Sequence, residues 1–226
     1  MIPPKAAFVK VFPADSAWIP CQGLPNWREC DIIQAINAAS EVLLMLLEFP
    51  NNIKELDEQD KWNCILQQLR SSWEEQKEDL NRFLCLSTAV WHCCINNDAL
   101  APGEIYSTEL MNQLEALAEY GWAHFEGRWE FNMFFGYMID LFPFFFGDWD
   151  TMTAKAKAML ALACEQAPDN PIPRVWYYGS FNGHPLYENA KKDAQTLAIN
   201  SFPRAENQNS IHWYFLGMLL PYDADY

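Results

Sequence analysis

Apolar residues recur at steps of three and four along most of the chain, which is the spacing of one face of an α-helix. The clearest stretches lie at 57–73, 80–91, 107–125, 129–142 and 150–166. Shorter ones lie at 174–178, 186–199 and 210–220, and an earlier one runs from Asp31 to near Pro50. Sustained alternation of apolar and polar residues, which is typical of strands, is nearly absent. The pattern therefore predicts an all-α fold of antiparallel helical hairpins.

Capping and breaking residues mark the ends of these segments. Ser107 is the expected N-cap of its helix, because a serine hydroxyl accepts a hydrogen bond from a free backbone N–H. Gly127 and Pro143 are expected to end the two helices that precede them. Residues 1–29, rich in proline and aromatic side chains, are expected to form an extended arm. Residues 30–226 then form a single α-helical domain, large enough to bury a core without disulfides.

A short motif occurs twice near the middle of the chain. The sequence Gly-Arg-Trp-Glu at 127–130 is followed twenty residues later by Gly-Asp-Trp-Asp at 147–150. The stretch 147–171 resembles part of a tetratricopeptide repeat, with Gly-Asp-Trp as the turn between two helices and Ala156, Leu160 and Ala163 as packing positions. It is about one helical turn longer than the spacing of that family, and no strict period recurs. The resemblance implies a short tetratricopeptide-like array, and an ordinary helical hairpin is the alternative.

Net charge narrows the range of partners. Thirty acidic and fifteen basic residues give a formal net charge of −15. Nucleic acid and anionic membrane surfaces repel such a chain, so neither is expected to bind it. A basic protein is the partner that this field attracts, and simple solubility is the alternative explanation of the acidity.

The acidity is concentrated in residues 104–150. This block holds nine acidic residues and a single basic one, Arg128, whereas residues 151–204 hold six basic and four acidic residues. It also contains eight of the fifteen phenylalanines. On the helix that begins at Ser107, three glutamates and one tryptophan fall on one stripe at steps of four, three and four. Like charges four residues apart cost roughly a few tenths of a kcal/mol, which indicates a functional reason for keeping them.

We interpret this block as an acidic docking surface edged by aromatic residues. Its carboxylates are expected to pair with lysine and arginine of a basic partner, and Trp122 to supply the anchor. The expected partner-binding residues are Glu115, Glu119, Trp122, Glu126, Glu130, Asp140, Asp148 and Asp150. The alternative is a solvated acidic face over an aromatic core. The phenylalanines at 144–146 are expected to pack in that core or at a helix end.

Motifs for catalysis and metal binding are missing from the sequence. The helical spacings His-Glu-x-x-His and Glu-x-x-His do not occur. His92, Cys93 and Cys94 are adjacent, but neighbouring helical side chains point about 100° apart and cannot share one tetrahedral metal. Neither a Gly-x-Ser-x-Gly turn nor a glycine-rich phosphate loop is present. We therefore expect no metal, no cofactor and no enzymatic activity.

Cysteine usage and hydropathy indicate the compartment. The seven cysteines are odd in number and scattered, which favours a reducing environment over a disulfide framework. The N-terminus lacks the pattern of a signal peptide. The longest aliphatic run, 42–47, is far below the ~20 residues that span a bilayer. A cytoplasmic protein is expected.

In its acidic aromatic block and its Gly-x-Trp hairpins, the chain resembles the all-α immunity proteins of bacterial polymorphic-toxin and contact-dependent-inhibition systems. The resemblance implies a cytoplasmic inhibitor that binds and neutralises a cognate, basic toxin. Two alternatives remain. One is a tetratricopeptide-like adaptor that binds peptide or protein partners, and the other is an all-α enzyme with an aromatic-lined pocket.

Overall fold

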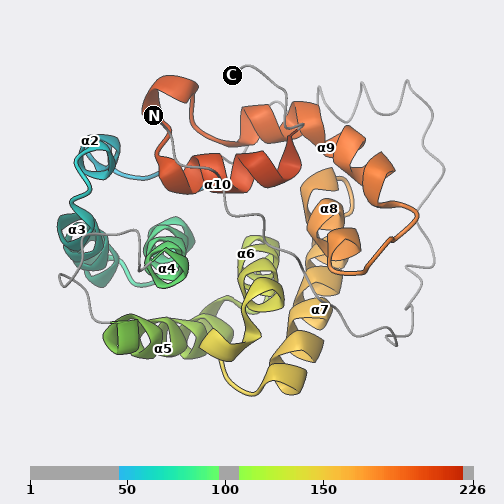
Figure 1. Cartoon of the computed structure of the whole chain (residues 1–226), viewed down its shortest axis with the longest axis horizontal. Helices are drawn as coiled ribbons and strands as arrows, with labels where there is room; N and C mark the ends of the chain where they lie inside the picture. Colours follow the sequence, from blue (N-terminus) through green and yellow to red (C-terminus); the bar gives the residue numbers. More distant parts are fainter. Residues whose placement is uncertain (1–45, 97–106, 221–226) are drawn as a thin grey trace.

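The computed structural model describes residues 46–96 and 107–220, and within these ranges helices joined by short turns form the whole structure (Figure 1). The α-helices are α2 (Ile53–Glu58), α3 (Trp62–Glu75), α4 (Leu80–Ile95), α5 (Ser107–Phe125), α6 (Trp129–Leu141), α7 (Trp149–Gln166), α8 (Pro171–Gly179), α9 (Tyr187–Ser201) and α10 (Ser210–Leu219). Two 3-10 turns, η1 (Pro143–Phe145) and η2 (Ala205–Asn207), join them. The predicted all-α fold is confirmed.

Two expected elements fall wholly or partly outside this structure. The arm at 1–29 and the cap on the side chain of Ser107 lie outside the described residues. Of the helix expected from Asp31 to Pro50, only 46–50 is described, and it is not helical. The sequence pattern also missed α2, because six residues are too few for a helical period to show.

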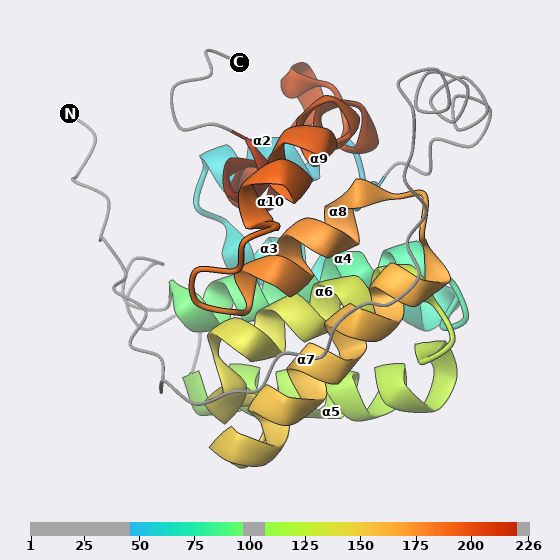
Figure 2. The same ribbon diagram turned by 90° about the vertical axis from the view of Figure 1, so that its right-hand side faces the viewer.

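Helix α6 is the centre of the fold. Every residue from Glu130 to Asp140 is buried, as expected for a helix that is apolar on all sides. It contacts α4, α5, α7, α8 and η1. Helix α4 is nearly as enclosed, since the run from Phe83 to Cys93 is buried. The rings of Phe83 and Phe135 stack between these two helices with centroids 5.6 Å apart. Figure 2 shows α6 with α5 below it, α8 above it and α7 in front of it.

Helices α6 and α7 form a close antiparallel pair. Asn132 near the start of α6 donates a hydrogen bond to Gln166 at the end of α7, over 3.0 Å. Further along, a Cβ on Gly136 would lie 2.8 Å from Leu160 Cγ and 3.2 Å from the Ala156 carbonyl oxygen. The small residue at 136 therefore permits the approach. The expected packing roles of Ala156 and Leu160 agree with this contact.

The next two helices also pack together, but the two pairs differ. Helices α6 and α7 have 13 and 18 residues, whereas α8 and α9 have 9 and 15. The two pairs therefore do not repeat one unit, and the resemblance to a tetratricopeptide repeat is limited to the segment 147–171. Helix α8 begins at Pro171. Proline is favoured at the first helical position, where no N–H is needed.

Both copies of the Gly-x-Trp motif precede a helix. Helix α6 begins at Trp129 and α7 at Trp149. Gly147 has φ of +143°, a backbone conformation that favours glycine. Asp148 then caps α7 by accepting a hydrogen bond from the Thr151 N–H at 3.0 Å. The turn that the sequence predicted here is therefore built from local interactions.

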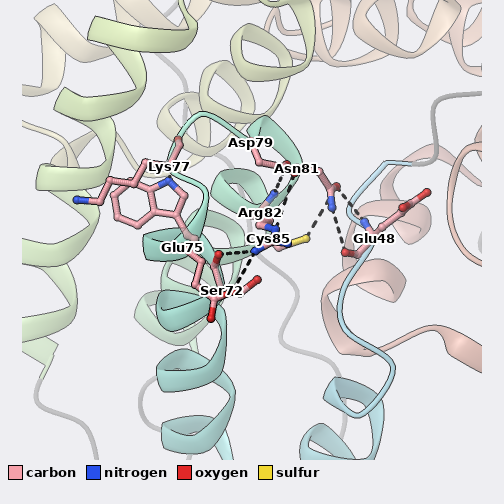
Figure 3. A network of polar contacts seen from close by, with 9 residues as sticks. Glu48, Ser72, Glu75, Lys77, Asp79, Asn81, Arg82 and Cys85 are labelled. Atoms are coloured by element: carbon pink, nitrogen blue, oxygen red, sulfur yellow. Dashed lines mark hydrogen bonds and ion pairs between the residues drawn. The ribbon is translucent and has the colours of Figure 1, made fainter.

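Polar contacts fix the turn between α3 and α4 (Figure 3). Arg82 donates to the Ser72 carbonyl oxygen at 2.8 Å, and the Asp79 side chain accepts from the Arg82 N–H at 3.0 Å. Asn81 pairs with the backbone of Glu48 through both its amide oxygen and its amide nitrogen, each at 3.0 Å. This amide ties the segment before α2 to the start of α4.

Replacing Gly136 by valine should destabilise the protein by about 2–3 kcal/mol, because the added methyl groups force α6 and α7 apart. Urea denaturation followed by circular dichroism measures the free energy of unfolding. Gly217 is a matched control, since a Cβ there meets no atom within 4 Å. Gly217→Ala in α10 should stabilise the protein by roughly 0.5–1 kcal/mol. Equal stability of Gly136→Val and the original protein would contradict the close helix pair.

Candidate functional site

Helix α5 has two flanks with different neighbours. On one flank the Tyr120 hydroxyl donates to the Lys77 carbonyl oxygen at 3.2 Å, and the Tyr120 ring meets Trp73 edge-on at 5.0 Å. This flank therefore packs on the turn between α3 and α4. The other flank carries Trp122, whose ring contacts Lys155 of α7. The predicted acidic stripe lies on this second side.

The glutamates of the stripe are exposed. Glu115, Glu119 and Glu126 all face solvent, and α5 contains no lysine or arginine to neutralise them. Consecutive members of the stripe are three or four residues apart, so their side chains lie along one line of the helix surface. Local periodicity was enough to predict this part of the surface.

Trp122, the predicted anchor, contacts a lysine of the same chain. It is half-buried, and the Lys155 ammonium nitrogen lies 3.1 Å from the ring centroid. Desolvation lowers the pKa of Lys155, while the carboxylate of Glu126 acts in the opposite direction. Lys155 thus places α7 beside the acidic stripe and covers a ring face of Trp122.

Two of the predicted partner-binding acids lie in the interior. Glu130 is 3% exposed and accepts a hydrogen bond from Arg128 at 3.0 Å. Asp140 is 9% exposed, near the other end of the same helix. Their assignment to an outer surface is wrong, because α6 is enclosed by neighbours on every side. The apolar character of α6 all around its axis was the signal in the sequence.

The acids at the start of α7 are exposed. Asp148 accepts hydrogen bonds from the Thr151 N–H at 3.0 Å and its hydroxyl at 2.7 Å, which lowers the pKa of the carboxyl and keeps it charged. Asp148 therefore has a structural role as a helix cap besides its negative charge. Asp150 follows in the first turn and is also exposed.

An aromatic pair beside these acids was missed. Phe144 is 55% exposed and Trp149 is 51% exposed, with ring centroids 6.3 Å apart and planes within 8° of parallel. Phe145 packs against Phe144 at 4.5 Å, whereas Phe146 is buried as expected. Phe144 thus packs at the start of α7 and not in the core, which is the second of the two positions expected for the 144–146 run. Phe144 and Phe145 lie in η1, where successive side chains point about 120° apart, so the two rings cannot both face the core.

These groups share one side of the molecule. Turn η1 contacts α5, and Lys155 joins α7 to Trp122. Helix α5 and the start of α7 lie at the bottom of both Figure 1 and Figure 2. We name this region the acidic-aromatic surface, and it consists of Glu115, Glu119, Glu126, Phe144, Asp148, Trp149 and Asp150. The fold therefore brings two segments of the acidic block together and removes Glu130 and Asp140.

A separate polar cluster joins α10 to α2 and α4. Asp57 accepts hydrogen bonds from the Ser210 N–H at 2.7 Å and the Ser210 hydroxyl at 3.0 Å, and His92 Nε2 lies 3.5 Å from that hydroxyl. In a hydrolase triad the carboxylate orients the histidine, which takes the serine proton. Here the carboxylate holds the serine itself. This arrangement caps α10 and leaves the histidine without an orienting acid.

His212 fixes the same helix from its other side. Its Nδ1 accepts from the Asn209 N–H at 3.1 Å, so Nε2 carries the proton and donates to the Leu47 carbonyl oxygen at 2.7 Å. Burial lowers the pKa of both His92 and His212 to about 4. Both side chains are therefore neutral around pH 7. We name Asp57, His92, Asn209, Ser210 and His212 the α10 capping cluster.

Two hollows lie elsewhere. One of about 440 Å³ lies on α3, and its described lining residues are Cys64, Gln67, Gln68, Ser71, Ser72 and Glu75. Another of about 210 Å³ lies between α3 and α5, beside Arg70 and Glu109. The described linings of these two hollows contain no aromatic residue, whereas the enzyme alternative expects an aromatic-lined pocket.

Among all the residues that the structure describes, no group of three or more His, Cys, Asp and Glu side chains is arranged to hold a metal ion. None of the described helices is both long and apolar enough to cross a bilayer.

The free energy of unfolding should fall as the pH drops from 6.5 to about 4. The first value is the ordinary pKa of histidine, and the second is the pKa of buried His92 and His212 in the native protein. Over this range the unfolded chain takes up protons that the native protein does not. Each histidine therefore contributes a loss of about 3 kcal/mol, complete below the native pKa. His212→Gln keeps a donor near Leu47 and should remove about half of this loss.

Urea denaturation of both proteins across this pH range checks the prediction. The comparison cancels the effect of Asp57, whose pKa burial raises. Parallel stability curves for the two proteins would contradict a neutral, buried His212.

Comparison of the chain with protein-family models, curated proteins and solved structures finds no significant match. What the chain binds must therefore be inferred from the chemistry of its own surface. On the described residues, that chemistry is a set of exposed carboxylates beside two exposed, parallel aromatic rings.

Proposed function

We propose that this chain binds and neutralises a basic protein through the acidic-aromatic surface, as the immunity proteins of bacterial toxin systems do. The observation that carries the proposal is the exposure of Phe144 and Trp149 next to carboxylates of α5 and α7. Aromatic residues are enriched in protein interfaces, and tryptophan is among the residues that most often dominate their binding energy. Carboxylates around them select a partner that carries lysine and arginine.

The net charge supports the same conclusion. At −15, the chain attracts a basic protein over roughly a Debye length and speeds its association. An inhibitor gains from this, because it has to reach its target before the target reaches a substrate. Electrostatic attraction mainly raises the association rate, whereas buried aromatic contacts mainly slow dissociation. The acidic-aromatic surface supplies both kinds of contact.

Reversing two charges of the stripe should weaken binding. In Glu115→Lys with Glu119→Lys, the affinity for the cognate partner should fall by roughly tenfold or more at low salt, mostly through a slower association rate. Helicity should stay unchanged, since both side chains are exposed. The partner is recovered by co-purification from the source cell, and surface plasmon resonance at several salt concentrations gives the two rates.

Glu74→Lys with Glu78→Lys is the matched control. These two glutamates are also exposed and also four residues apart, but they flank the end of α3. Net charge changes by the same amount in both double variants. Equal losses of affinity would show an effect of overall charge, and no loss at 115 and 119 would refute docking at the stripe.

Removing the exposed indole of Trp149 should weaken binding through faster dissociation. Trp149→Ala should cost about 2 kcal/mol of binding free energy, mainly as faster dissociation, because the ring is expected to be buried by the partner. The stability of the free protein should change little, since half of this ring faces solvent. Ile199→Ala on α9 is the control, because Ile199 is 52% exposed and lies outside the acidic-aromatic surface. Similar dissociation rates for the two variants would exclude Trp149 as an anchor.

A further inference from the structure

The acidic stripe of α5 already holds a cation. The ammonium group of Lys155 lies over the Trp122 ring with its nitrogen 3.1 Å from the ring centroid. The carboxylate of Glu126, one helical turn after Trp122, is close enough to stabilise the charge of this lysine. An aromatic face with a carboxylate beside it is a general binding site for ammonium and guanidinium groups. The occupant here comes from the chain itself.

Two opposing effects act on the charge of Lys155 at this position. Contact with the ring removes part of the water around its ammonium group, and this desolvation is the largest effect on its pKa, which it lowers. Ammonium is strongly hydrated, whereas guanidinium is planar, weakly hydrated and stacks on aromatic rings. An arginine side chain therefore fits the face of Trp122 better than the lysine that covers it.

We propose that Trp122 and Glu126 form a recognition site for an arginine side chain of the partner, and that Lys155 occupies this site until the partner displaces it. The proposal rests on the proposed function, since it places the site within the stripe that docks a basic protein. Exposed Glu115 and Glu119 lie on the same stripe and hold further positive charges of the partner. A partner side chain must bind the Trp122 ring more strongly than Lys155 does in order to displace it, and this requirement favours arginine-rich partners over lysine-rich ones.

A matched pair of variants tests the displacement. Lys157 lies on the same helix and has its nitrogen 4.8 Å from the Phe181 ring centroid. It is two residues from Lys155 and so points to the other flank of α7. Lys155→Met and Lys157→Met change the net charge equally, and each removes one ammonium group from a ring face. Hexa-arginine and hexa-lysine peptides serve as probes, and isothermal titration at low salt gives their affinities.

Lys155→Met should bind hexa-arginine about fivefold more tightly than Lys157→Met does. The gain should be smaller for hexa-lysine. It should disappear when Trp122→Leu is added to both variants, and thermal melts select the variants that remain folded. Equal affinities of Lys155→Met and Lys157→Met for hexa-arginine would overturn the proposal. A lower melting temperature of Lys155→Met with no gain in affinity would also overturn it, because Lys155 is then only a structural contact.

The same titrations separate this proposal from the proposed function. If both methionine variants bind alike but Glu115→Lys with Glu119→Lys weakens binding, the stripe docks cations and the arginine site is wrong. If the affinity gain appears but the double charge reversal has no effect on peptide or partner, the arginine site stands and the wider docking surface is wrong. Absence of hexa-arginine binding to Lys155→Met overturns the arginine site, whereas the proposed function is tested by the partner itself.

Discussion

Burial of α6 on all sides is the constraint on which the rest of this structure depends. A helix that is apolar around its whole circumference has to be surrounded, and α4, α5, α7 and α8 supply the surrounding surfaces. Each of these helices turns one face toward α6. Helices α5 and α7 turn other faces to solvent, whereas α4 is itself nearly enclosed. Glycine at 136 allows α7 to lie close to α6, because a Cβ at this position would meet Leu160 and the Ala156 carbonyl oxygen.

The candidate site is a consequence of this arrangement. Because α5 and the start of α7 lie on the same side of α6, acids that are far apart in the sequence meet on one surface. The 3-10 turn after α6 cannot bury every phenylalanine it carries, so Phe144 stacks with Trp149 in the open. The segment between α6 and α7 therefore supplies both exposed Phe144 of the acidic-aromatic surface and buried Phe146 of the core.

Two charged or polar contacts between helices have different physical roles. The α10 capping cluster replaces water around buried groups with hydrogen bonds from the protein, and its histidines stay neutral because a charge would be poorly solvated there. Lys155 keeps its charge at the surface, where the π-face of Trp122 and the carboxylate of Glu126 partly replace its hydration. The first kind of contact stabilises the fold. The second can exchange with an outside cation, because its charged group still borders on solvent.

The sequence by itself determined the helices and several of their ends. Apolar spacing located α3 to α7, Pro143 ended α6, and the Gly-Asp-Trp turn before α7 formed as expected, because these features depend on neighbouring residues. The exposed glutamates of α5 followed from the same helical period. Only the tertiary structure decided that Glu130 and Asp140 are buried, that Phe144 is exposed and that Lys155 covers Trp122. Whether a side chain meets solvent depends on which distant helix packs against it, and a local pattern does not contain that information.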